Sequence, residues 1–198
     1  MRTTLAAFAG LLLLAACAGP PAPRETFHRL ESPPVAERLA APALPGVLEI
    51  DRVETEGVLA ERAIAFQTGS GALQRYAYEF WSETPGVMMQ DIVARSLRAA
   101  GAAGTVVTPD LRVPPDWILR AKLQRFEHLP ATSKVALRLQ VAVISARNGA
   151  LLLLKDYDAE TGGAEATTVA PAMNRAVADA VGRLVADVGR LVPPPARP

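Results

Sequence analysis

Alternation of apolar and polar residues predicts three consecutive strands in the second half of the chain. Residues 117–124 and 135–143 place apolar side chains at every second position, and residues 150–158 follow after Asn148 and Gly149. A period of two puts these side chains on one face of a strand. Because Asn-Gly favours a two-residue type I′ hairpin, we expect an antiparallel meander whose last turn is of that type.

Shorter segments in the first half extend the predicted sheet. Gly69, Ser70 and Gly71 separate two strand-like runs, which indicates a hairpin. The other segments are bounded by residues that favour turns. The five predicted strands are residues 26–30, 47–54, 63–67, 72–81 and 104–108.

Two amphipathic helices complete the pattern. Thr84 is a suitable N-cap, Pro85 fits the first helical position and Gly101 suits the C-terminal end. A longer helix is predicted over residues 166–192, ahead of a run of prolines that cannot continue it. Its apolar residues recur at steps of three and four: Val169, Met173, Val177, Val181, Leu184, Val188 and Leu191.

These elements predict an α/β fold. A mixed, largely antiparallel sheet should pack against the two amphipathic helices as a layered α/β sandwich. We expect residues 25–192 to form a single domain, because a segment of this length can bury a sizeable core. Residues 193–198 are expected to be a proline-rich tail.

The first 17 residues resemble a bacterial lipoprotein signal peptide. Arg2 precedes an apolar run over residues 5–14, which is too short for a stable transmembrane helix. Small residues then lead to Cys17, the only cysteine of the chain. We expect residues 1–16 to be removed and Cys17 to carry a diacylglyceryl lipid, a modification that anchors proteins stably when two or more acyl chains are present.

Residues 17–24 are then a lipidated cysteine followed by an extended, proline-rich spacer. Ala18 follows the cysteine, where an acidic residue would favour the inner membrane. We therefore expect an outer-membrane anchor with the folded part on the periplasmic face. The alternative is an ordinary secretory signal in which Cys17 has no special role.

Charge and composition narrow the possible partners. Without Arg2, the 21 basic residues become 20, which equals the 20 acidic residues. A nucleic-acid partner would favour a basic face, and a membrane-binding polybasic patch would also need excess positive charge. We therefore expect neither.

Candidate catalytic groups are few. The two histidines, His28 and His128, lie 100 positions apart, and no further cysteine is available for a zinc site. We interpret His128 and its neighbour Glu127 as a solvated strand end, with a metal or acid–base role as the alternative. Ser70 lacks the Gly-x-Ser-x-Gly spacing of a nucleophile. The sequence therefore predicts no enzyme, no cofactor and no metal.

An aromatic cluster is the most distinctive remaining feature. Tyr76, Tyr78, Phe80 and Trp81 supply four of the ten aromatic residues within six positions. Packing in the core is one interpretation. The other is a contact surface for protein or lipid, for which amphipathic aromatic side chains are well suited.

Three segments between residues 47 and 101 carry a resemblance to a known family: Val47-Leu48-Glu49-Ile50, Tyr76-Ala77-Tyr78-Glu79-Phe80-Trp81 and the helix ending Leu97-Arg98-Ala99-Ala100-Gly101. In these segments the chain resembles the ABC-type transport auxiliary lipoprotein component family, the PqiC-like proteins. Relatives carry a proline-aspartate-tyrosine-leucine-aspartate-arginine segment before the strand at Ile64. Here residues 55–62 keep only the leucine and the arginine of that segment, Leu59 and Arg62.

The resemblance implies a non-enzymatic role in moving lipids between two membranes. Its members accompany an ABC permease, an ATPase and an MCE-domain protein, and a ring of several copies is expected. On this basis Leu59, Arg62 and the aromatic strand are the candidate contact residues for a partner or a phospholipid. Two alternatives remain: a subunit of an oligomeric outer-membrane secretion or pore assembly, and an exported hydrolase that uses His128 with a carboxylate.

Overall fold

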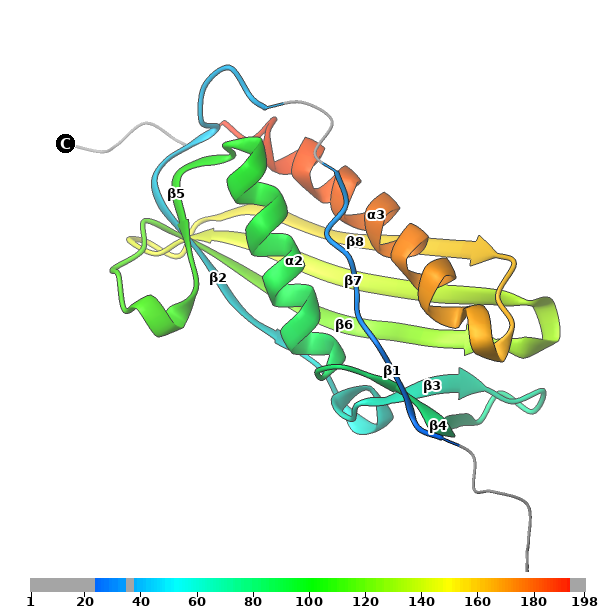
Figure 1. Cartoon of the computed structure of the whole chain (residues 1–198). Coiled ribbons are helices and arrows are strands. Elements are labelled where there is room, and N and C mark those ends of the chain that lie inside the picture. Colours follow the sequence, from blue (N-terminus) through cyan, green and yellow to red (C-terminus); the bar gives the residue numbers. More distant parts are fainter. Residues whose placement is uncertain (1–23, 35–37, 193–198) are drawn as a thin grey trace, which may run out of the picture.

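The computed structural model describes residues 24–34 and 38–192 (Figure 1). The predicted signal peptide, Cys17, nearly all of the spacer and the tail at residues 193–198 lie outside the described residues. The strands are β1 (Thr26–His28), β2 (Leu44–Glu54), β3 (Ala63–Gln67), β4 (Leu73–Trp81), β5 (Ala103–Val107), β6 (Trp117–Leu129), β7 (Lys134–Ser145) and β8 (Leu151–Gly162). The helices are α2 (Pro85–Ala100) and α3 (Val169–Val188).

Strand β6 organises the sheet, because both of its edges are paired. One edge pairs with β7 in the antiparallel sense over the whole length of β6, and β8 continues that meander. The other edge is shared by two strands that run parallel to it. Residues 117–122 pair with β2, and residues 127–128 pair with β3. The predicted mixed, largely antiparallel sheet is therefore confirmed.

Strands β2 and β3 behave as one interrupted strand along β6. Both run in the same direction on the same edge, and the short 3₁₀ helix η2 (Gly57–Ala60) leaves the sheet between them. Beyond the interruption, β3 pairs with β4 as the predicted hairpin, and β4 pairs with β1 in parallel. Before it, β2 pairs with β5. The sheet therefore divides into two wings beside β6.

Both helices cover the same face of the sheet (Figure 1). Helix α2 packs on β2 and β5, while α3 packs on β7 and β8. The predicted apolar stripe of α3 is buried from Val169 to Val188, and it meets a sheet face whose side chains are fully buried. The sheet contributes Leu48, Ile50, Leu119, Leu123, Leu139, Val141 and Val143 to this core.

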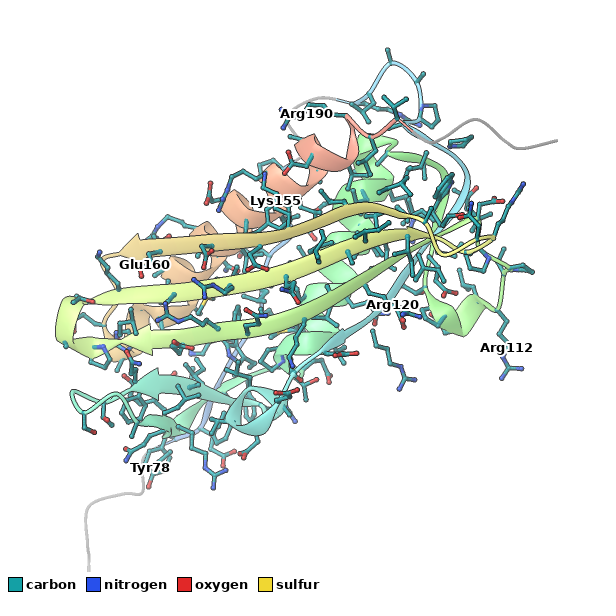
Figure 2. All side chains as sticks on the ribbon, turned by 180° about the vertical axis from the view of Figure 1, so that it is seen from behind. Tyr78, Arg112, Arg120, Lys155, Glu160 and Arg190 are labelled. Carbon is teal, nitrogen blue, oxygen red and sulfur yellow. The ribbon has the colours of Figure 1, made fainter. Side chains whose placement is uncertain are left out.

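The chain between β1 and β2 crosses the helix layer (Figure 1). The side chain of Leu30 is buried there, and the backbone N–H of Glu31 donates to Oδ1 of Asn174 on α3 at 3.0 Å. The opposite face of the sheet is covered by neither helix, and Figure 2 shows Arg120 and Glu160 among its side chains. The layered arrangement is therefore two helices on one face and polar side chains on the other.

The turn between β7 and β8 differs from the prediction. Of its residues only Gly149 has a positive φ, at 71°, whereas a type I′ turn needs positive φ at both central residues. The backbone N–H of Ser145 donates to the carbonyl of Ala150, and the N–H of Gly149 donates to the carbonyl of Ser145. The connection is therefore a four-residue loop over residues 146–149, and the two-residue prediction was wrong.

Candidate functional site

The aromatic cluster lies in the wing formed by β1, β3 and β4. Its members do not share one environment, because alternation places Trp81 on the opposite face of β4 from Tyr78 and Phe80, and because the register between β3 and β4 shifts between Ala63 and Ala65. Such an irregularity inserts extra residues into one strand and re-aims its side chains. The four aromatic residues of β4 therefore divide into an internal pair and an external pair.

Trp81 and Tyr76 form the internal pair. Trp81 is 1% exposed and packs against Phe126 of β6, with 5.3 Å between the ring centroids. Tyr76 packs on Phe66 at 4.6 Å, and its hydroxyl lies 2.7 Å from Nδ1 of His128. Burial, followed by the charges of Glu165 and Glu79, raises the pKa of the Tyr76 hydroxyl, so it stays a proton donor at neutral pH.

Phe80 and Tyr78 form the external pair. Phe80 stacks on Phe27 of β1, with 5.5 Å between the ring centroids, and Phe27 is itself 53% exposed. Tyr78 is 44% exposed and projects from the edge of the wing (Figure 2). These two residues are the part of the predicted aromatic strand that a partner can reach.

Arg62 completes this external group. Its guanidinium lies 5.3 Å from the centroid of the Phe27 ring, and its Nε donates to the carbonyl of Trp81 at 3.2 Å. Within the part of the chain that the structure describes, the Arg62 guanidinium has no carboxylate within salt-bridge distance. We call Phe27, Arg62, Tyr78 and Phe80 the aromatic edge.

Leu59 has a different position from its predicted companion Arg62. It lies in η2, where the chain leaves the sheet, and its side chain is 6% exposed within the core cluster. Its contribution is to fill the core where β2 and β3 are interrupted. The monomer therefore presents Arg62 at the surface while Leu59 and Trp81 are buried.

Phe27 is the member of the aromatic edge that the sequence analysis missed. It pairs with Phe80 across the parallel β1–β4 ladder, although the two residues are 53 positions apart. The only sequence signal was its place inside a predicted strand. A three-residue strand that pairs in parallel gives no turn or spacing that would identify its partner.

His128 is buried, in contrast to the predicted solvated strand end. It is 2% exposed, and both ring nitrogens have partners: the Tyr76 hydroxyl at Nδ1 and the carbonyl of Ala164 at Nε2, 3.0 Å away. Since a carbonyl only accepts, Nε2 carries the proton and Nδ1 accepts from tyrosine. The neighbouring Glu127 binds Arg125 at 2.8 Å. This arrangement ties β6 to β4 and to the segment before α3.

Ser70, and two neighbouring carboxylates on β8, also have local partners. Ser70 lies at the β3–β4 hairpin, where its hydroxyl contacts that of Thr68 at 2.9 Å. Asp158 pairs with Arg138, and Asp156 accepts from Gln140, across β7 and β8. No group of three or more potential metal ligands occurs among the described residues.

Two hollows flank α2. The larger, about 790 Å³, lies between the end of β2, the start of α2 and the turn after β5, and Arg52, Gln90, Asp110 and Arg112 line it. The smaller, about 420 Å³, lies beside the C-terminal half of α2. The lining of the larger hollow combines two arginines with the carboxylate of Asp110 and with the hydroxyls of Thr55 and Thr84.

No helix in residues 24–34 or 38–192 is both long enough and apolar enough to cross a membrane.

The fold is similar to those of solved structures. Protein XCC0632 from Xanthomonas campestris is 18% identical and matches 81% of this chain and 92% of its own, with a TM-score of 0.71. A second crystal structure, of an uncharacterized protein, is 12% identical and covers 85% of this chain and 98% of its own, with a TM-score of 0.64. At these identities the likeness concerns the fold.

Sequence comparison identifies the family. No curated protein matches the chain significantly. The family model described as "ABC-type transport auxiliary lipoprotein component" matches residues 28–188, which run from the end of β1 to the end of α3. The resemblance noted in the sequence is thus confirmed over nearly the whole folded part. The chain belongs to the family of ABC-type transport auxiliary lipoprotein components.

Proposed function

We propose that this protein is a non-enzymatic, outer-membrane-anchored periplasmic component of an ABC-type lipid transport system that includes an MCE-domain protein. The observation that carries the proposal is the family match over residues 28–188. In this role the folded part docks partner proteins, the permease and ATPase supply energy at the other membrane, and several copies of the chain assemble together.

The described residues support a binding role over a catalytic one. The two histidines are held by neighbouring groups: His128 by Tyr76 and the carbonyl of Ala164, and His28 by Glu79, 2.6 Å away. General acid–base catalysis needs such a side chain within reach of a substrate proton. Here the same side chains connect strands, which favours a rigid scaffold.

The lipid anchor is tested by changing its one attachment point. Cys17→Ser should move the protein from the membrane fraction to the soluble fraction, because the acyl chains supply the membrane affinity. Fractionation and mass spectrometry of the intact protein measure the location and the lipid mass. Ser70→Ala, at the exposed hairpin, is the matched control and should stay in the membrane fraction.

Lipid transport should be lost in the Cys17→Ser strain although the domain stays folded. Retention of Cys17→Ser in the membrane fraction would contradict the anchor. Full transport by the soluble protein would contradict the need for it.

Partner docking is tested with the wild-type protein. Purification through a tag on this chain should retain an MCE-domain protein encoded beside it, together with the permease and the ATPase under mild solubilisation. Native mass spectrometry of the same preparation gives the number of copies of this chain. A preparation that retains neither an MCE-domain protein nor phospholipid would overturn the proposed role.

A further inference from the structure

We propose that the aromatic edge rests in the headgroup layer of the membrane to which Cys17 is anchored. The proposal rests on the lipid anchor proposed above and adds an orientation to it. Phe27 and Tyr78 would enter the interface, with Phe80 packed behind Phe27 and the guanidinium of Arg62 directed at lipid phosphates.

The length of the spacer limits which part of the molecule can reach the membrane. Nine residue steps separate Cys17 from Thr26, the first residue of β1. A fully extended chain spans at most about 3.6 Å per residue, so Thr26 lies within about 32 Å of the anchored cysteine. Phe27 is the next residue along the chain, so the aromatic edge is the exposed apolar surface nearest to the anchor in sequence.

The chemistry of the aromatic edge fits the boundary between water and lipid. Phe27 and Tyr78 are both substantially exposed, although large apolar side chains are usually covered. Tyrosine combines an apolar ring with a polar hydroxyl, and aromatic residues of this kind collect at membrane interfaces. The arginine can extend its charged group toward water and phosphate while its stem stays near apolar groups.

Arg62 provides the contact that distinguishes a lipid surface from a purely apolar partner. It is held in place by the Phe27 ring and by the carbonyl of Trp81, yet none of the salt bridges found among the described residues involves it. A guanidinium binds phosphate oxygens through two parallel hydrogen bonds. A phospholipid surface therefore complements both the guanidinium of Arg62, through its phosphates, and the aromatic rings, through its apolar part.

A second exposed apolar patch lies toward the opposite end of β6 and is farther from the anchor in sequence. Leu151 and Leu154 begin β8, and the register places them beside the start of β6 through Ile144 and Ala142. The aromatic edge instead belongs to the wing that pairs with residues 127–128 of β6. Seven to ten residues of strand separate the two patches along β6, or about 24–34 Å at 3.4 Å per residue.

Site-directed spin labelling of the full, lipidated protein in vesicles tests the orientation. Lipidation consumes the thiol of Cys17, so a cysteine introduced by Tyr78→Cys becomes the one reactive thiol. Leu154→Cys is the matched control, because Leu154 is also an exposed strand residue, at 61%. The vesicles contain phosphatidylethanolamine and phosphatidylglycerol, and power saturation compares accessibility to oxygen with accessibility to a water-soluble nickel complex.

We expect the label at position 78 to be more accessible to oxygen than to nickel, and the label at position 154 to show the reverse order. Equal, water-like accessibility at both positions would overturn the membrane contact. Protection of position 78 from both reagents would also overturn it, by assigning the edge to a protein contact. Intact-mass measurement separates these results from a failure of the anchor, since protein without lipid mass overturns the anchor itself.

Discussion

At the scale of single residues, Tyr157 joins the sheet to α3. Its ring is completely buried, and its hydroxyl donates to Oδ2 of Asp187 at 3.0 Å. Lys155 donates to the same oxygen at 2.7 Å, and Arg190 binds Oδ1 at 2.8 Å. Figure 2 shows Lys155 and Arg190 on the side of the molecule where β8 meets α3. The carboxylate of Asp187 on α3 therefore gathers three donors, two from β8 and one from the turn that follows α3.

Tyr157→Phe should lower the free energy of unfolding by about 1–2 kcal/mol, because it removes a hydrogen bond to a charged acceptor while Lys155 and Arg190 still satisfy that acceptor. Urea denaturation followed by circular dichroism measures the change. Tyr78→Phe removes the same hydroxyl from an exposed position and should leave the midpoint unchanged. Equal effects at both positions would contradict a structural role for the Tyr157 hydroxyl.

The same carboxylate should give the protein a pH-dependent stability. The hydrogen bond from Lys155 is the largest cause that lowers the pKa of Asp187 in the folded state. Because this pKa lies below the unfolded value of about 3.9, the stabilisation is complete above that value and is lost as the pH falls through the folded pKa. Asp187→Asn, which cannot ionise, should therefore lose less stability than the wild type below pH 4.

Urea midpoints measured at intervals between pH 7 and pH 3 test this expectation. The wild-type and Asp187→Asn curves should differ most at neutral pH and converge in acid. Curves that stay parallel over the whole range would contradict the assignment.

At the scale of elements, the close approach of α2 to β2 depends on a glycine. A Cβ atom on Gly86 would lie 2.6 Å from the carbonyl oxygen of Val53, and backbone atoms cannot move aside cheaply. In α3, by contrast, a Cβ atom on Gly182 would meet nothing within 4 Å. A side chain is therefore excluded by steric contact at position 86 and has free space at position 182.

Gly86→Ala should destabilise the protein by about 1–3 kcal/mol, the usual cost of overpacking. Gly182→Ala should stabilise it by about 0.5–1 kcal/mol, because alanine restricts the unfolded chain and favours a helix interior. Thermal or urea denaturation of the two variants side by side measures the difference. Destabilisation by Gly182→Ala, or tolerance of Gly86→Ala, would contradict the helix placement.

Local patterns predicted the elements well but not their parallel pairings. The meander from Trp117 onward, the β3–β4 hairpin and both helices follow from periodicity, turn residues and caps. The parallel ladders join residues far apart in sequence, such as Thr26 with Glu79 and Leu48 with Trp117, and no local signal marks such partners. The prediction of a two-residue turn after Ser145 was wrong, because an Asn-Gly pair permits a type I′ turn without requiring it.

The candidate site shows the same limit. Sequence reasoning found Arg62, Tyr78 and Phe80 but did not predict that Trp81 and Leu59 are buried. Alternation places Trp81 on the opposite face of the strand from Tyr78 and Phe80, but it groups Tyr76 with the exposed pair, and the register shift between β3 and β4 lies along this stretch. The contact of the aromatic edge with a partner or a lipid stays a prediction.

At the scale of the whole molecule, the two wings share one core. Strand β6 pairs with both wings, α2 contacts α3, and a single hydrophobic cluster includes residues from every layer. The two tryptophans report on different parts of this core. Trp81 lies in the wing of β1, β3 and β4, whereas Trp117 opens β6 beside β2.

The protein should therefore unfold in one cooperative transition. In Trp117→Phe the fluorescence of Trp81 should follow the same urea curve as the circular dichroism of that variant. In Trp81→Phe the fluorescence of Trp117 should likewise coincide with circular dichroism. Fluorescence and circular dichroism midpoints that separate within either variant would show that one wing unfolds without the other.

The position of β6 also sets the order in which the chain can complete its fold. Until residues 117–129 are present, β2 with β5 and β3 with β4 and β1 are two separate ribbons that lack the strand joining them. Strands β6, β7 and β8 follow one another and pair locally, so they can form without the earlier half. A ribosome or a translocation channel, which delivers the chain from its amino end, therefore releases both unfinished ribbons before the template that unites them.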